Sequence, residues 1–174
     1  MGKQSLPKIT LRYNGLFDFD RVYSTIIDWA KTYGYMWHER QYKHKVSGLG
    51  AEQEFIWELN KNVNEYINFK IIFEVHGWDL VELEMEQNGQ KKPMSSGRIY
   101  MVMSGTVTWD WQNKFAKGGF AKLLGKWYEK MAMKDISLYF DQLYYRMWNL
   151  HALLKKYFEM QTKKHTYKGY LREG

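Results

Sequence analysis

The chain has 174 residues, a formal net charge of +7 and no cysteine. This length suits one full hydrophobic core, so we expect a single α+β domain at residues 1–160 and a basic tail at 161–174. The lack of cysteine excludes disulfides, thiolate metal sites and a cysteine nucleophile. Hydrophobic residues make up 45% of the chain and aromatic residues 18%, a composition unlike that of disordered proteins.

The N-terminal residues do not resemble a signal peptide. Lys3, Pro7 and Lys8 interrupt any apolar run after Met1, and a signal peptide needs such a run. The sequence also has no stretch of about 18 uncharged apolar residues, which a bilayer-spanning helix would need. We therefore expect a cytoplasmic protein or a component of an intracellular assembly.

The first elements are predicted to be a strand and a helix. Alternation over residues 8–13 predicts the strand, and Asn14-Gly15 is expected to turn the chain. Asp18 has the position of a helix N-cap, and Gly34 fits a left-handed C-cap, so we predict a helix over about 19–33. The apolar face of this helix has residues spaced four, three and four apart, namely Val22, Ile26, Trp29 and Tyr33.

Period-two patterns then predict five strands, at about residues 35–46, 52–59, 67–75, 81–86 and 99–111. His76-Gly77 is expected to separate the third from the fourth of these strands, and Asn88-Gly89 to open a polar loop. Because the links are short, the strands should form an antiparallel meander. Aromatic side chains on the predicted inner faces are candidates for lining an apolar cavity: Trp37, Phe55, Trp57, Phe69, Phe73, Trp109 and Trp111.

The helical period returns from about residue 119 to 160. One apolar seam has residues spaced alternately four and three apart, namely Ile136, Phe140, Leu143, Met147, Leu150, Leu154 and Tyr157. An unbroken helix of this length would extend roughly 60 Å, so we predict a break near Met133–Asp135. The expected fold is α+β: a curved antiparallel sheet of about six strands with a long C-terminal helix packed on it. Its element order is one strand, one helix, five strands and two helices.

This element order resembles that of the helix-grip proteins, which include the START-like and polyketide-cyclase-like families. The resemblance implies a long C-terminal helix that lies across a concave sheet and encloses an apolar cavity. It carries over no site residues. The chain departs from the family pattern because it has one helix after the first strand rather than two, and about six strands rather than seven.

Motifs for catalysis and metal binding are not found. Gly119–Lys126 has five residues between its glycines where a P-loop has four, and Trp127 occupies the Ser/Thr position. His38 and His44 would lie roughly 20 Å apart along one strand, too far to bind one ion. Ser95–Gly97 lacks a nucleophile elbow. We therefore assign no catalytic residue, cofactor or metal, and we lean against an enzyme.

The net charge is concentrated in the last third of the chain. Residues 1–112 contain 13 Lys/Arg and 14 Asp/Glu, whereas residues 113–174 contain 13 and 5. Lysines four apart on a helix repel one another by a few tenths of a kcal/mol, so this pattern favours an acidic partner. The candidate partner-binding residues are Lys122, Lys126, Lys130, Lys134, Lys155 and Lys156. A row of glutamates on one predicted outer strand face offers an acidic docking surface: Glu82, Glu84 and Glu86.

These patterns predict a non-catalytic structural or interaction subunit. It would dock through the basic amphipathic C-terminal helical face onto acidic surfaces, within a homo-oligomer or a larger assembly such as a virus particle. Tyr139, Tyr145 and Trp148 lie outside the apolar seam and fit an interface. The alternatives are a non-specific nucleic-acid-binding protein and a helix-grip carrier of a small apolar ligand. Residues 120–134 could also lie on a membrane surface, but we expect their apolar face to be buried on the sheet.

Overall fold

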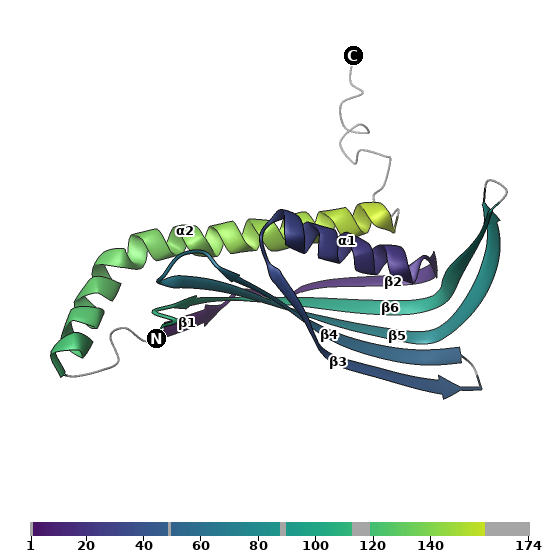
Figure 1. Cartoon of the computed structure of the whole chain (residues 1–174), viewed down its shortest axis with the longest axis horizontal. Helices are drawn as coiled ribbons and strands as arrows, with labels where there is room; N and C mark the ends of the chain where they lie inside the picture. The colour runs from purple at the N-terminus through teal and green to yellow at the C-terminus, as the bar shows by residue number, and fades with distance from the viewer. Residues whose placement is uncertain (1, 49, 88–89, 113–118, 159–174) are drawn as a thin grey trace, which may run out of the picture.

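The computed structural model describes residues 2–48, 50–87, 90–112 and 119–158, and within these ranges it omits the side chains at 47, 86–87, 90, 92 and 119–135. It shows an α+β fold in which two helices cover one face of a curved antiparallel sheet (Figure 1). The strands are β1 (Gly2–Ser5), β2 (Ile9–Phe17), β3 (Met36–Ser47), β4 (Gly50–Asn62), β5 (Ile67–Gln87) and β6 (Gln90–Trp109). The helices are α1 (Phe19–Thr32) and α2 (Gly119–Tyr157).

The strands are arranged in the order β1-β6-β5-β4-β3, and β2 pairs with β6 on the same edge as β1. The predicted curved antiparallel sheet and C-terminal helix are confirmed, but the element order is two strands, one helix, four strands and one helix. β1 was not predicted, because its four residues lack any apolar alternation. β5 unites two predicted strands, and α2 unites two predicted helices.

The predicted first helix is confirmed as α1. Asp18 caps it, because its Oδ1 accepts a hydrogen bond from the backbone N–H of Arg21 at 3.0 Å. Gly34 follows the helix with a φ of +71°, the left-handed conformation that a glycine C-cap supplies. The expected turn at Asn14-Gly15 is wrong, since both residues pair with β6 inside β2.

β5 continues through His76-Gly77, where we expected a break. Gly77 stays paired with Ile99 of β6, and the side chain of Leu80 occupies the space beside it, 2.8 Å from where a Cβ would lie. The expected polar loop after Asn88-Gly89 is also wrong, because β6 begins at Gln90, which pairs with Gln87. Residues 88–89 themselves lie outside the described residues.

A β-bulge inverts the faces of β5 beyond Trp78. Trp78 pairs with Arg98 and Val81 pairs with Ser96, so β5 holds one extra residue between these pairs. Such an insertion moves every later side chain to the opposite face. The side chain of Val81 is consequently 44% exposed, and Glu82 lies on the concave face that carries the helices. The expected outer position of Glu82 is therefore wrong.

β3 contains a similar bulge between Glu39 and Gln41. Glu39 pairs with the buried Trp57, so it lies on the concave face, whereas Lys43 pairs with Glu54 on the convex face. Regular alternation along β3 would place Glu39 and Lys43 on one face, and the bulge places them on opposite faces. The bulge also places His38 and His44 on opposite faces.

α2 is a single helix, so the break expected near Met133–Asp135 is wrong. Figure 1 shows a bend in the N-terminal part of this helix instead. We judged an unbroken helix too long for a small domain, but the sheet is equally elongated. β6 has 20 residues, about 66 Å at 3.3 Å per residue, whereas the 39 residues of α2 measure roughly 58 Å along the helix axis and less from end to end because of the bend.

The core fills the space between the helices and the sheet. The predicted α2 seam is confirmed, with five members at most 2% exposed: Ile136, Leu143, Met147, Leu150 and Leu154. These residues belong to the same core cluster as Trp57, Phe69 and Phe73, whose side chains are also at most 2% exposed. Among the described residues, neither helix is long and apolar enough to cross a bilayer.

Candidate functional site

An open groove of about 520 Å³ lies on the concave face, between the start of α1 and the strands β3 to β6. The segments that line it meet at the end of the molecule where β5 and β6 curve upward past α1 (Figure 1). Four carboxylates line it, from Asp18, Asp20, Glu39 and Glu82, and we call it the acidic groove.

Aromatic rings form the floor of the acidic groove. The ring of Phe55 stacks on Phe19 and tilts against Tyr42, with a ring-centroid distance of 5.0 Å in each pair. Phe55 is buried, but the side chain of Tyr42 is 52% exposed. The groove therefore offers a solvent-accessible aromatic surface, which can take apolar groups or the face-on approach of a cation.

Glu39 faces the groove by regular alternation from Trp37, whereas the β5 bulge turns Glu82 into the rim. Glu39 accepts a hydrogen bond from the Trp57 indole N–H at 3.0 Å, and burial together with this carboxylate raises the pKa of Tyr23. Among the described lining residues none is Lys or Arg, and none of the four rim carboxylates forms an ion pair with a described residue. A chain of net charge +7 thus carries a locally acidic groove.

The wall of the groove is anchored to the end of α2. The Tyr157 hydroxyl donates to the carbonyl of Asp18 at 2.9 Å and accepts from the backbone N–H of Asp18 at 3.1 Å. Burial raises the pKa of Tyr157, so the hydroxyl keeps its proton for donation at neutral pH. These bonds hold the first turn of α1 in place, and with it the positions of Asp18 and Asp20.

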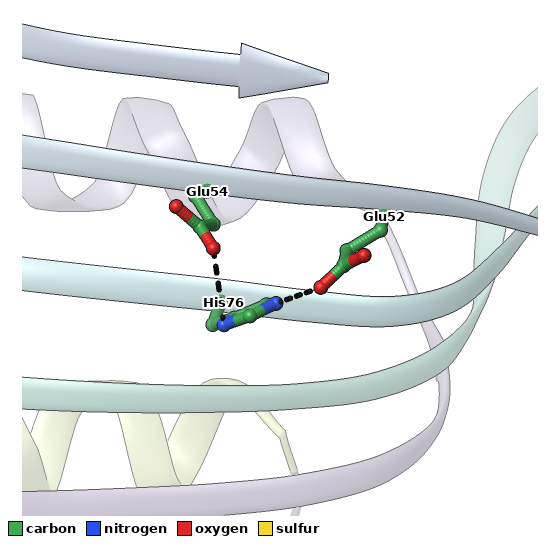
Figure 2. A group of neighbouring side chains, drawn as sticks. All are labelled: Glu52, Glu54 and His76. Atoms are coloured by element: carbon green, nitrogen blue, oxygen red, sulfur yellow. Dashed lines mark hydrogen bonds and ion pairs between the residues drawn. The ribbon is translucent and has the colours of Figure 1, made fainter. Parts of the chain in front are cut away.

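A second cluster lies on the convex face, where His76 of β5 sits between Glu52 and Glu54 of β4 (Figure 2). The His76 Nε2 atom is 2.7 Å from Glu52 Oε1, and Nδ1 is 3.7 Å from Glu54 Oε1. Trp78 stacks on the imidazole at a centroid distance of 3.8 Å. A hydrogen bond from Lys43 holds the pKa of Glu54 below its usual value.

One ligand atom from each of these three residues lies within 4.8 Å of the others, a spacing that can hold a metal ion. The two ring nitrogens of His76 face different carboxylates, however, and one ion binds one ring nitrogen. Lys43 already offsets the charge of Glu54, at 3.0 Å. We therefore interpret the cluster as a side-chain clamp between β4 and β5. The sequence did not indicate it, because the pairing of Glu54 with His76 depends on strand register.

The predicted basic and acidic site residues lie in different places. Lys122, Lys126, Lys130 and Lys134 belong to the first half of α2, and their side chains lie outside the described residues. Lys155 and Lys156 are in the last turn of the same helix, half-buried and exposed respectively. Glu82 lines the acidic groove, Glu84 pairs with Lys91 at 3.3 Å, and the Glu86 side chain is not described.

The aromatic residues predicted to line a cavity mostly pack the core. Trp57 and Phe73 stack at 6.0 Å, and Phe69 packs edge-on against Tyr139. Trp57, Phe69 and Phe73 do not line the acidic groove or either of two convex-face pockets formed by described residues. Phe55 lines the acidic groove and Trp111 a convex-face pocket. Trp37 and Trp109 are partly buried against the core.

No protein-family model and no curated protein sequence matches this chain. Its function is therefore inferred from the geometry described above. The sequence did not indicate the acidic groove, because its rim combines carboxylates from α1, β3 and β5, and the β5 bulge turns Glu82 inward.

Proposed function

We propose that this protein is a non-catalytic interaction subunit that associates head to tail. The lysine-rich start of α2 in one copy docks into the acidic groove of the next copy. The observation that carries the proposal is the acidic groove itself, whose four carboxylates have no cation among the described lining residues. Asp18 and Glu39 each accept one N–H hydrogen bond, but a groove lined by carboxylates favours a cationic partner.

The two surfaces lie too far apart to meet within one molecule. Residues 119–134 occupy one end of the long axis in Figure 1, and the strands and helix turn that form the acidic groove occupy the other. A contact between two different patches is heterologous, so it joins successive copies into a ring or an open chain. This arrangement supports an assembly subunit rather than a closed, self-neutralised monomer.

The start of α2 combines lysines and apolar residues, which complement the carboxylate rim and the aromatic floor of the groove. By helical spacing, the lysines at 122, 126, 130 and 134 share one side of α2, where they would face the carboxylate rim. The neighbouring apolar residues Phe120 and Trp127 would contact the aromatic floor. An amphipathic helix laid into a groove is a common mode of peptide recognition, in which apolar anchors supply affinity and charges supply orientation and association rate.

A peptide-binding experiment tests the proposal. A fluorescently labelled peptide of residues 119–135 is titrated with the full-length protein, and its anisotropy is followed at about 50 mM and about 500 mM salt. We expect saturable binding that weakens at the higher salt, where the Debye length is about 4 Å. The double variant Asp20→Lys/Glu82→Lys should weaken binding at least about tenfold, since two attractive charges become repulsive.

Glu74→Lys is the matched control, because Glu74 is exposed on the convex face away from the groove. It makes the same charge change as Asp20→Lys or Glu82→Lys alone, with which it is compared, and should alter the affinity less than about twofold. Anisotropy that stays flat up to high micromolar protein would refute the proposal. Equal weakening by Glu74→Lys and by the groove variants would also refute it, because the effect would then reflect net charge alone.

Nucleic-acid binding is the second candidate, and one observation favours it. A convex-face pocket of about 540 Å³ contains two guanidinium–aromatic pairs, with Arg12 4.9 Å from the ring of Tyr100 and Arg98 6.0 Å from the ring of Trp78. Such pairs can bind phosphates and stack bases. Asp79 offsets Arg98 through an ion pair, so this proposal ranks second. Flat anisotropy of a labelled single-stranded oligonucleotide at about 50 mM salt would dismiss it.

A further inference from the structure

α2 presents a second stripe to solvent, on the side opposite its buried seam. The members of this outer stripe are spaced alternately three and four apart and are all exposed: Leu138, Asp141, Tyr145, Trp148 and Ala152. Tyr145 is 69% exposed, Leu138 65% and Trp148 42%. Exposed aromatic residues of this kind are enriched at protein–protein interfaces, where they become buried and dominate the binding energy. This surface therefore has the composition of an interface.

Neither α1 nor the sheet covers the outer stripe. On one flank of α2, Asn149 accepts a hydrogen bond from the Trp29 indole N–H of α1 at 2.9 Å, and Arg146 lies 4.2 Å from the ring of Tyr33. On the other flank, His151 is buried beside β2. The neighbours of α2 thus contact its two flanks and its seam, and the outer stripe faces away from all of them.

The charges along the outer stripe are arranged to complement a second copy of the same helix. Asp141 is exposed towards the N-terminal end, Lys155 and Lys156 lie at the C-terminal end, and Trp148 is midway between them. An antiparallel two-fold contact would place Asp141 of each copy against the lysines of the other. A parallel contact would instead oppose like charges, which is unfavourable at an interface.

We propose that the outer stripe of α2 is an isologous homodimer interface, with a second copy of this chain packed antiparallel about a two-fold axis near Trp148. In such a contact the same patch is used by both copies. The aromatic side chains of Tyr145 and Trp148 meet at the centre, and the acid–lysine pairs form at both ends. The interface uses no residue of the acidic groove, so it stands independently of the head-to-tail association.

Single-cysteine crosslinking tests the geometry directly, because the chain has no cysteine of its own. Trp148→Cys places a thiol next to the axis, where the two copies can form a disulfide across a Cβ–Cβ distance of about 4 Å. Leu138→Cys is the matched control, since ten residues correspond to about 15 Å of helix, and the two thiols of a dimer would be about 30 Å apart. We expect Trp148→Cys to crosslink at least about tenfold faster on mild oxidation.

Sedimentation equilibrium of the cysteine-free protein provides the second measurement. Tyr145→Glu should weaken the dimer at least about tenfold, whereas Met36→Glu, on β3 and 64% exposed, should leave it unchanged. Asp141→Lys should weaken the dimer, and adding Lys155→Glu and Lys156→Glu should restore it. Equal crosslinking of the two cysteine variants, a monomer at about 100 µM, or the absence of restoration by the charge swap would each overturn the proposal.

Discussion

The position of α2 on the sheet depends on Gly105 of β6. A Cβ built at Gly105 would overlap the sulfur of Met147 and lie 3.4 Å from a methyl group of Leu143. Both of these α2 side chains are fully buried. We therefore predict that Gly105→Ala destabilises the protein, although alanine is otherwise the more favourable residue in a strand.

The expected cost follows from two opposing effects. Inserting a methyl group into a filled core costs about 1–3 kcal/mol, and replacing glycine in a strand recovers about 0.5–1 kcal/mol of backbone entropy. A net loss of about 1–2 kcal/mol remains. Met147→Ala alone should cost about 2–5 kcal/mol, but it removes the atom that Gly105→Ala would displace. In that background we expect Gly105→Ala to be neutral or slightly stabilising.

The measurement is a double-mutant cycle by urea unfolding at a fixed protein concentration. The coupling between the two substitutions should be about 1–3 kcal/mol and favourable. Gly48→Ala is the control, because nothing lies within 4 Å of a Cβ at that position, and it should change the free energy of unfolding by less than about 0.5 kcal/mol. Additive effects of Gly105→Ala and Met147→Ala would refute the close packing of α2 on β6.

Three further substitutions test local features of the fold. Burial lowers the pKa of His151. The contribution of its neutral form to stability is therefore fully present above the unfolded-state pKa of about 6.5, and it is lost as the pH falls through the folded-state pKa. His151→Gln should flatten the decline of the urea unfolding midpoint between about pH 7 and pH 5. Asp18→Ala removes the acceptor for the Arg21 N–H and should cost about 0.5–2 kcal/mol of unfolding free energy. Gly34→Ala places a side chain at a φ of +71° and should cost about 1–2 kcal/mol, whereas a neutral result would contradict the left-handed cap.

Sequence patterns correctly predicted the elements whose determining residues lie close together in the chain. α1 was found because its cap, its apolar face and its terminal glycine all lie within about 17 residues of sequence. The α2 seam was found because a three-four repeat persists through the whole buried part of the helix. The antiparallel arrangement of the strands followed from short connections, which parallel strands cannot use.

The candidate site could not be predicted, because it depends on two inserted residues. Alternation from Val75 onward, counted in steps of two, keeps Val81 inside and Glu82 outside. The extra residue of β5, next to Asp79 with its φ of +54°, reverses both. A non-glycine residue adopts a positive φ where tertiary contacts stabilise that backbone conformation, and residue type alone does not show it. Gly97 was a signal for the bulge, because it lies opposite and a Cβ at this position would be 2.8 Å from the Trp78 carbonyl oxygen.

The two proposed contacts are compatible with one assembly, and their combination constrains its form. α2 runs along the long axis of the molecule, with the basic start at one end and the acidic groove at the other (Figure 1). An antiparallel dimer through the outer stripe would therefore expose one acidic groove and one basic helix start at each of its ends. Head-to-tail docking could then extend the dimer in both directions with unlike charges facing each other.

Disrupting the outer stripe with Tyr145→Glu should leave peptide binding in the groove intact, whereas Asp20→Lys/Glu82→Lys should abolish assemblies larger than the dimer and preserve the dimer. Loss of both contacts from either change would show that the two surfaces are not independent.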